Sequence, residues 1–153
     1  MLKRQAITVK TSILGGWGVF ADRHFLPGQL IEEAPLLPVD DVHQGLNNYY
    51  FTAKENDQRY LALGYGSLYN HAGQANIRFS MDLSRQVMLF HATRLIAPGE
   101  ELCIDYGVPW FEKRDIPIRE TSAWQLRWQR CSGHVWRLGL VCGLGALFYI
   151  FIR

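Results

Sequence analysis

The first 110 residues consist of short apolar or alternating segments, and none of them has the apolar period of a long helix. Residues of the turn-forming types Gly, Pro, Asn and Asp separate these segments, which lie at 6–9, 18–21, 30–33, 77–81, 87–92 and 102–106. Short segments with such boundaries are typical of β-strands. The sequence therefore predicts a mainly β body of short strands.

Two stretches of this body repeat one pattern, at residues 23–31 and 94–102. In both, an Arg is followed at the same spacing by Pro, Gly and an aliphatic residue. Pro presets φ at the second position of a type II turn, and Gly supplies the positive φ at the third. Each copy therefore predicts a turn that leads into a strand.

Charge and hydropathy change near residue 110. Residues 1–110 carry 9 Lys or Arg and 11 Asp or Glu, whereas residues 111–153 carry 7 and 3. We therefore divide the chain into a body over residues 1–112, a connector with an amphipathic helix over 113–134, and an apolar C-terminal helix over 135–153.

The C-terminal segment contains 15 consecutive residues without a charge, at 138–152. As a helix with a rise of about 1.5 Å per residue, this run is about 22 Å long, short of the roughly 30 Å of a bilayer core. Trp and Arg residues before the run nevertheless favour membrane contact through residues 135–153, and their positive charge predicts that the body stays in the cytoplasm. The alternative is a helix buried against the body.

Composition excludes several classes of protein. With 48% apolar and 20% charged residues the chain is an ordinary globular protein, and its net charge of +2 gives no direct signal of nucleic-acid binding. The three cysteines and the histidines lack the spacing of a zinc site, so we expect free thiols and no metal. The basic N-terminus has no apolar run behind it, which argues against a cleaved signal peptide.

Three motifs in the body carry most of the functional information. They are GGWGVFA at 15–21, GSLYNH at 66–71 with Asn76 behind it, and PGEELCIDYG at 98–107. In this order and at these distances they resemble the SET domain family of protein-lysine methyltransferases, over roughly residues 6–110. The resemblance implies a SET-type (β-clip) fold, with short strands in small sheets around a knot-like crossing, and here a C-terminal helical tail.

In that family a methyl group passes from S-adenosyl-L-methionine to a lysine side chain of a protein substrate. The resemblance implies that the backbone around Gly16, Trp17 and Gly18 binds the cofactor, since glycine has no Cβ and lets the backbone approach a ligand closely. It also implies that Asn70 and His71 contact the cofactor and help to form the crossing. From the residues alone, the same stretches are equally consistent with an ordinary loop and a polar turn.

Tyr106 is our first candidate for a catalytic residue. Lysine, whose ordinary pKa is about 10.4, must be neutral to accept a methyl group, so the site needs alignment, a dry aromatic channel and an oxygen that orients the amine. A tyrosine hydroxyl at the end of a buried strand supplies that oxygen. Tyr50, or its neighbour Tyr49, is the candidate for a second channel tyrosine, and Trp110 or Phe111 for a cover over the adenine or the lysine. These last four residues are also consistent with core aromatics.

The chain departs from the family pattern at several positions. Ala72 stands where Ser usually follows Asn-His, Ala75 replaces the usual Pro, and residues 67–69 replace the usual Arg-Phe. The sequence also lacks the cysteine clusters that flank many members. These departures support a second hypothesis, in which the chain is a catalytically inactive SET-like module that binds a protein partner, tethered to a membrane.

Overall fold

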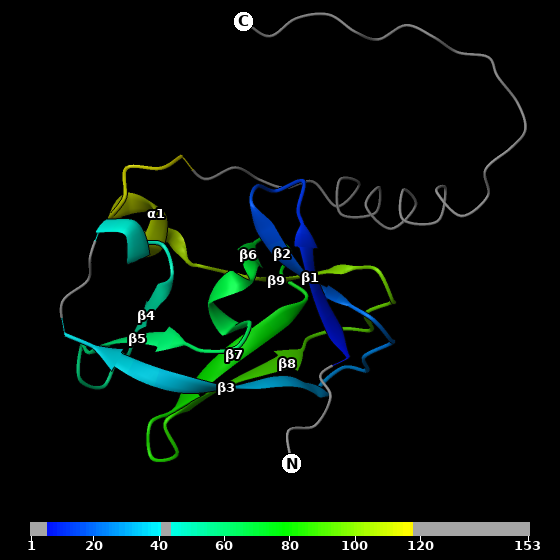
Figure 1. Ribbon diagram of the computed structural model, residues 1–153, viewed down its shortest axis with the longest axis horizontal. Coiled ribbons are helices and arrows are strands. Elements are labelled where there is room, and N and C mark those ends of the chain that lie inside the picture. Colours follow the sequence, from blue (N-terminus) through cyan, green and yellow to red (C-terminus); the bar gives the residue numbers. More distant parts are fainter. Residues whose placement is uncertain (1–5, 41–43, 118–153) are drawn as a thin grey trace, which may run out of the picture.

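The computed structural model describes residues 6–40 and 44–117 (Figure 1). Most of this part is strand and turn, and its helices are short. The prediction of a mainly β body is therefore confirmed. None of the helices in these two ranges is long and apolar enough to cross a membrane. The rest of the connector beyond residue 117 and the apolar helix at 135–153 lie outside the described residues and stay predictions.

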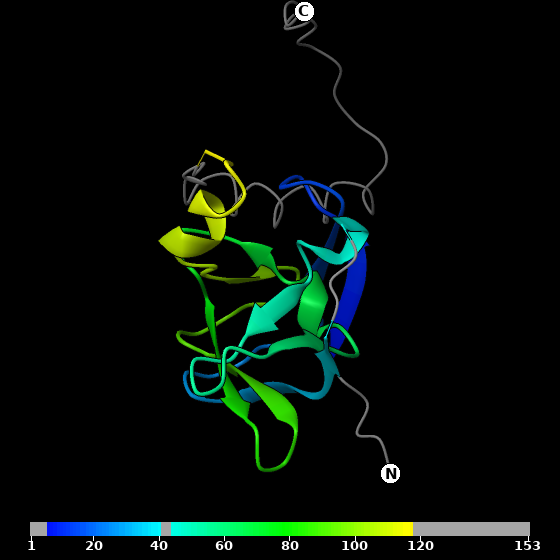
Figure 2. The same ribbon diagram turned by 90° about the vertical axis from the view of Figure 1, so that its left-hand side faces the viewer.

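The strands form two sheets (Figures 1 and 2). The smaller sheet contains, in spatial order, β1 (Ile7–Thr11), β2 (Trp17–Ala21), β9 (Glu101–Ile104) and β6 (Asn70–His71). The larger contains β4 (Tyr50–Thr52), β5 (Arg59–Ala62), β3 (Leu30–Val39), β8 (Val87–Ala92) and β7 (Ile77–Asp82). Neighbouring strands are antiparallel except β6, which runs parallel to β9. A segment from the middle of the chain thus lies beside the last strand of the body.

Three short helices complete the described part. They are the 3₁₀ turns η1 (Gln44–Leu46) and η2 (Gly66–Leu68) and the helix α1 (Val108–Glu112). Pro109 near the start of α1 suits a first helical turn, where no backbone N–H has a partner within the helix. Because η2 leads into β6 and α1 follows β9, both helices are close to the point where these two strands pair.

One apolar cluster of the described residues joins the two sheets. Tyr69 and Phe90 lie near its centre, with ring centroids 4.6 Å apart. The largest fully buried apolar side chains are Tyr69, Phe25, Phe90, Ile77, Met88, Ile96, Leu102 and Ile104. Burial stabilises a fold by about 25 cal/mol per Å² of apolar surface, so these side chains from distant parts of the sequence hold the sheets together.

All six strands predicted from the sequence are present, with ends that differ by a few residues. The largest difference is at β3, which continues to Val39 through Pro35 and Pro38. Residues up to Pro35 pair with β8, and residues from Leu36 pair with β5. A strand residue that pairs on one side only can lack a backbone N–H, so the change of partner explains why two prolines are tolerated.

The two sequence repeats lie against each other. Phe25 and Ile96, one from each copy, exchange two backbone hydrogen bonds of 3.0 Å. The turns are of the predicted kind, because Gly28 and Gly99 have φ of +79° and +82°. Each turn is closed by a backbone hydrogen bond, from Gln29 to Leu26 at 3.0 Å in the first copy and from Glu100 to Ala97 at 3.1 Å in the second.

The buried carboxylate of Glu32 fixes the segment that leads to β6. Glu32 is 2% exposed, and it accepts hydrogen bonds from the Tyr69 hydroxyl at 2.7 Å and from the Tyr65 backbone N–H at 2.9 Å. A Cβ on Gly64 would lie 2.7 Å from Glu32 Oε1, so glycine is needed there. Burial, and then the neighbouring carboxylate, raise the pKa of the Tyr69 hydroxyl well above its ordinary value, so it remains a donor.

Replacing Glu32 with Ala is expected to lower the free energy of unfolding by about 2–4 kcal/mol, because the buried Tyr69 hydroxyl and the partly buried Tyr65 N–H lose their acceptor. Glu33→Ala is the matched control, since Glu33 is the next residue in β3 and its side chain forms a surface ion pair with Arg85 at 2.7 Å. That pair contributes about 0.5 kcal/mol or less. Urea unfolding monitored by circular dichroism measures both changes, and equal losses in the two variants would contradict the assignment.

Candidate active site

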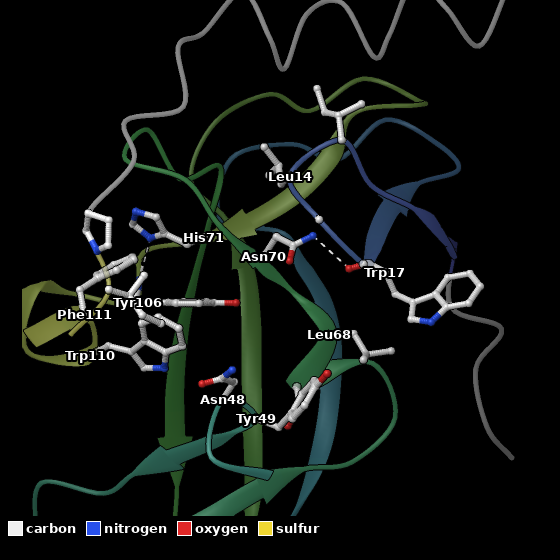
Figure 3. A pocket seen from close by; sticks show the side chains of 16 residues that line it. Leu14, Trp17, Asn48, Tyr49, Leu68, Asn70, His71, Tyr106, Trp110 and Phe111 are labelled. Carbon is white, nitrogen blue, oxygen red and sulfur yellow. Dashed lines mark hydrogen bonds between the residues drawn. The ribbon is translucent and has the colours of Figure 1, made fainter. Parts of the chain in front are cut away.

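A pocket of about 750 Å³ opens where the three sequence motifs meet (Figure 3). Residues 13–17 form one side of it, and residues 48–49 and 67–71, apart from Tyr69, form others. The remaining lining residues come from the end of the body: Tyr106, Trp110, Phe111, Ile116 and Pro117. Figure 3 shows the aromatic residues of this last group together with His71 on one side, and Leu14 and Asn70 on the other.

The glycine turn between β1 and β2 forms the non-aromatic side of the pocket. Gly15 and Gly16 have φ of +122° and +59°, and a Cβ on either would meet no atom within 4 Å. Their backbone conformation, rather than a lack of space, is therefore what requires glycine there. The Ser12 N–H donates to the Gly16 carbonyl at 3.0 Å and closes the turn.

Gly16 and Trp17 line the pocket as the sequence suggested, whereas Gly18 is not among its lining residues. A Cβ on Gly18 would lie 2.3 Å from Glu101 Oε1, so this glycine makes room for a buried carboxylate. The Trp17 ring points away from the other pocket side chains in Figure 3, and the residue is 63% exposed. What Trp17 offers to the site is its backbone, whose carbonyl accepts a hydrogen bond from Asn70 Nδ2 at 3.0 Å.

Glu101 joins the glycine turn to the Asn-His motif. It is 3% exposed, and its two oxygens accept hydrogen bonds from Ser12 Oγ at 2.8 Å and from Asn70 Nδ2 at 2.7 Å. The sequence motif contained this glutamate, but we assigned no role to it or to Ser12. The signal that was available is its place in the GEEL motif, at the start of a strand that is buried throughout.

Asn76 binds the backbone of β9 through two hydrogen bonds. Its side-chain amide donates to the Glu101 carbonyl at 2.8 Å and accepts the Cys103 N–H at 2.8 Å, with the whole residue 2% exposed. The Ala72 N–H in turn donates to the Ile104 carbonyl at 3.1 Å. The chain from the Asn-His motif to Asn76 is thus bonded to β9 at both ends, in the region where the resemblance places the crossing of segments.

Tyr106 lies just beyond β9 and faces the aromatic side of the pocket. Its hydroxyl donates to the Tyr69 carbonyl at 2.8 Å, and its ring centroid is 4.6 Å from that of Trp110. Burial raises the pKa of Tyr106 to about 12, so the hydroxyl keeps its proton at neutral pH. With that proton bound to a carbonyl, the lone pairs of the oxygen remain available to accept a hydrogen bond.

His71, which lies in the neighbouring strand β6, binds the backbone of Tyr106. Its Nδ1 accepts the Tyr106 N–H at 3.2 Å, and Asp105 Oδ1 lies 3.6 Å from the same nitrogen. Accepting this bond requires an unprotonated Nδ1, and in the neutral ring the proton is then on Nε2. Nε2 is buried and has no hydrogen-bond partner within the described part of the chain. Burial lowers the pKa of His71, although the Asp105 carboxylate opposes the shift.

The remaining aromatic candidates differ in their placement. Trp110 and Phe111, which were alternatives in the sequence, both line the pocket. Of the two candidate channel tyrosines, Tyr49 lines the pocket and Tyr50 does not. Tyr50 begins β4, with the guanidinium groups of Arg59 and Arg114 each 5.4 Å from its ring centroid. The structure therefore favours Tyr49 over Tyr50 as the second tyrosine of the site.

Acidification below pH 6.5 is expected to destabilise the fold through His71. Because its pKa is lower in the folded chain than the ordinary 6.5, the unfolded chain binds the proton more readily. This contribution to stability is fully present above pH 6.5 and is lost as the pH falls below it. Urea unfolding at pH 7.5 and 5.5 measures the loss, which should be smaller in His71→Gln and unchanged in His24→Gln, a variant of an exposed histidine. An equal loss in His71→Gln and the parent would contradict this origin.

Comparisons with known proteins agree with the geometry. The model of the SET domain family matches residues 16–107. A histone-lysine N-methyltransferase of Schizosaccharomyces pombe, described as H3 lysine-37 specific, is 32% identical over an alignment of 117 residues. The alignment covers 71% of this chain and 79% of that relative.

Solved structures show the same fold. A Plasmodium falciparum protein assigned as a histone methyltransferase superposes with a TM-score of 0.61 at 29% identity, over 71% of this chain and 99% of its own. A mutant of the Chaetomium thermophilum Polycomb Repressive Complex 2 has a TM-score of 0.55 at 24% identity, over 69% of this chain and 15% of its own, and shows likeness of fold alone. The ordered motifs, the family match and these relatives show that the chain belongs to the SET domain family of protein-lysine methyltransferases.

Proposed function

We propose that this chain transfers a methyl group from S-adenosyl-L-methionine to the side-chain amine of a lysine in another protein, and that the transfer takes place in the pocket beside Tyr106. The single observation that carries the proposal is the arrangement of that pocket. A glycine turn with exposed backbone forms one side, and a tyrosine hydroxyl among aromatic rings forms the other. The family and the histone-lysine methyltransferase relative support the same class of enzyme.

The pocket suits S-adenosylmethionine in size and in chemistry. Its volume of about 750 Å³ is that of a site for a small molecule. The left-handed backbone at Gly16 presents main-chain groups to the pocket. S-adenosylmethionine supplies a methyl group on a positively charged sulfur, and aromatic faces favour such a cation.

Asn70 has a narrower role in this proposal than the sequence suggested. Its Nδ2 donates to both Trp17 O and Glu101 Oε1, so this nitrogen is already used. The backbone and Oδ1 of Asn70 are what it can offer to the cofactor. Its side chain acts mainly as a brace that fixes the glycine turn against β9.

Tyr106 orients the amine of the acceptor lysine. The proton of its hydroxyl is bound to the Tyr69 carbonyl, so the oxygen accepts a hydrogen bond from the amine. The nitrogen lone pair is then free to point at the methyl group. With a pKa of about 12, this hydroxyl is almost never deprotonated at neutral pH and offers no phenolate as a base. The lysine must therefore reach the pocket neutral or lose its proton to water. The rings of Tyr106, Trp110 and Phe111, with centroids 4.6–6.2 Å apart, exclude water around it.

The two alanines that suggested an inactive module lie away from the pocket lining. Ala72 is fully buried and Ala75 offers its carbonyl to Thr93 Oγ1 at 3.4 Å. Neither substitution removes a group that lines the site, so an active enzyme is the function that the geometry supports best. The acceptor protein is not specified by the pocket, and histone H3 is the first acceptor to test because the Schizosaccharomyces pombe relative is described as specific for it.

A cytoplasmic location and membrane contact through residues 135–153 stay proposals that rest on the sequence. What supports them is the run of uncharged residues at 138–152 with basic residues before it.

Tyr106→Phe is expected to lower kcat about a hundredfold, because the lost oxygen no longer aligns the amine. The dissociation constant for S-adenosylmethionine should stay within about threefold, since the ring and its contacts remain. Isothermal titration measures the affinity, and transfer of tritiated methyl to histone H3 or to a lysate protein measures the rate. Tyr60→Phe is the control, because Tyr60 belongs to β5 and does not line the pocket.

Two results would contradict this function. If the full chain does not bind S-adenosylmethionine, the proposed reaction is wrong. If Tyr106→Phe binds the cofactor and methylates at the parental rate, the role of Tyr106 is wrong.

Glu101→Ala is expected to weaken S-adenosylmethionine binding about tenfold, because Asn70 and Ser12 lose the acceptor that they share. The same titration measures the affinity, and Glu33→Ala on the larger sheet should leave it unchanged. Thermal unfolding of both variants separates loss of the site from loss of the fold. Parental affinity in a folded Glu101→Ala variant would show that the carboxylate does not organise the pocket.

A further inference from the structure

Arg114 connects two segments that lie far apart in the sequence and that both line the pocket. It follows α1 by two residues, and its side chain reaches back to the segment between η1 and β4. Its Nε donates to Asn48 Oδ1 at 3.1 Å, and its Nη2 donates to the Asn47 carbonyl. The third nitrogen, Nη1, donates to the Trp110 carbonyl at 3.0 Å within its own segment.

The guanidinium plane adds stacking to these hydrogen bonds. Its central carbon lies 4.3 Å from the ring centroid of Trp110 and 5.4 Å from that of Tyr50. A planar group with donors on both edges is what lets one side chain bond in three directions while it covers a ring. A lysine carries the same charge but has neither the plane nor the spread of donors.

The two connected segments both contribute side chains to the pocket lining. Asn48 and Tyr49 come from one of them, and Trp110 and Phe111 come from the other. Figure 3 shows Asn48 and Tyr49 on a different segment from the group of Tyr106, Trp110 and Phe111. The position of one segment relative to the other therefore affects the shape of the aromatic part of the pocket.

We propose that Arg114 is a positioning residue that holds the 47–50 segment against α1 and so fixes the shape of the aromatic channel for the acceptor lysine. It acts through Tyr49 and Trp110 and does not itself line the pocket. That this channel holds the acceptor lysine rests on the function proposed above. The connection between the two segments rests only on the contacts of Arg114.

The test compares Arg114→Ala, Arg114→Lys and a control in the full chain. Arg59→Ala is the matched control, because Arg59 contacts the same Tyr50 ring at the same 5.4 Å and comes from β5, away from the pocket lining. Hydrogen exchange followed by mass spectrometry reports on the amides of residues 44–52 without any need for activity. We expect their exchange to be about tenfold faster in both Arg114 variants and unchanged in Arg59→Ala, since the loss of these bonds releases the segment.

Kinetics with recombinant histone H3 as acceptor supply the second measurement. Arg114→Ala should raise KM for the acceptor about tenfold, while the S-adenosylmethionine dissociation constant from titration stays within about twofold. The Lys variant should resemble the Ala variant, because shape rather than charge carries the effect.

The outcomes test the connection made by Arg114 separately from the proposed reaction. Parental exchange of residues 44–52 in Arg114→Ala would overturn the proposal, and so would full restoration by Lys or an equal effect in Arg59→Ala. If the parent chain transfers no methyl group to any acceptor but hydrogen exchange of residues 44–52 changes as expected, the positioning role of Arg114 is supported and the proposed function is wrong.

Discussion

The site depends on one buried carboxylate. Glu101 binds the hydroxyl of Ser12 before the glycine turn and the amide of Asn70 in β6, while the backbone of the same residue binds Asn76. A buried charge is stable only when its oxygens are hydrogen-bonded, so the requirement of Glu101 for partners fixes how three distant segments meet. Gly18 follows from the same constraint, because any side chain there would collide with the carboxylate.

The position of Tyr106 follows from the order that Glu101 imposes. Once β9 is held between β2 and β6, the chain leaves the sheet after Ile104, and the Gly107 N–H binds the Asp105 side chain at 2.9 Å. Tyr106 is then fixed through both its backbone and its hydroxyl, by His71 and by the carbonyl of Tyr69. The reaction that we propose needs this kind of rigidity, since in it the hydroxyl would orient a neutral amine rather than act as a strong base.

The sequence was informative where a residue type has a narrow structural meaning. Positive φ at Gly28 and Gly99 and the placement of Gly16 and Tyr106 at one pocket follow from motifs that could be recognised without a structure. It was less informative for β4 and β6, which have three and two residues and so carry no periodic pattern. The choice between Tyr49 and Tyr50 and the role of Arg114 depend on contacts between segments far apart in the chain, which neither spacing nor propensity contains.

The paired repeats have a consequence for how the chain reaches its native state. The Gly28 N–H donates to the Ala92 carbonyl at 2.8 Å, just before the second repeat, and the Gly99 N–H donates to the Ala21 carbonyl at 2.7 Å, just before the first. Each turn is therefore held by the chain that precedes the other, so neither is complete until both ends of the body have met. Contacts between residues so far apart in the sequence require closure of a long loop before they stabilise the fold. Chains dominated by such contacts fold slowly. We therefore expect the body to form as one cooperative unit, in which the glycine turn at its beginning and the tyrosine at its end come together in the same step.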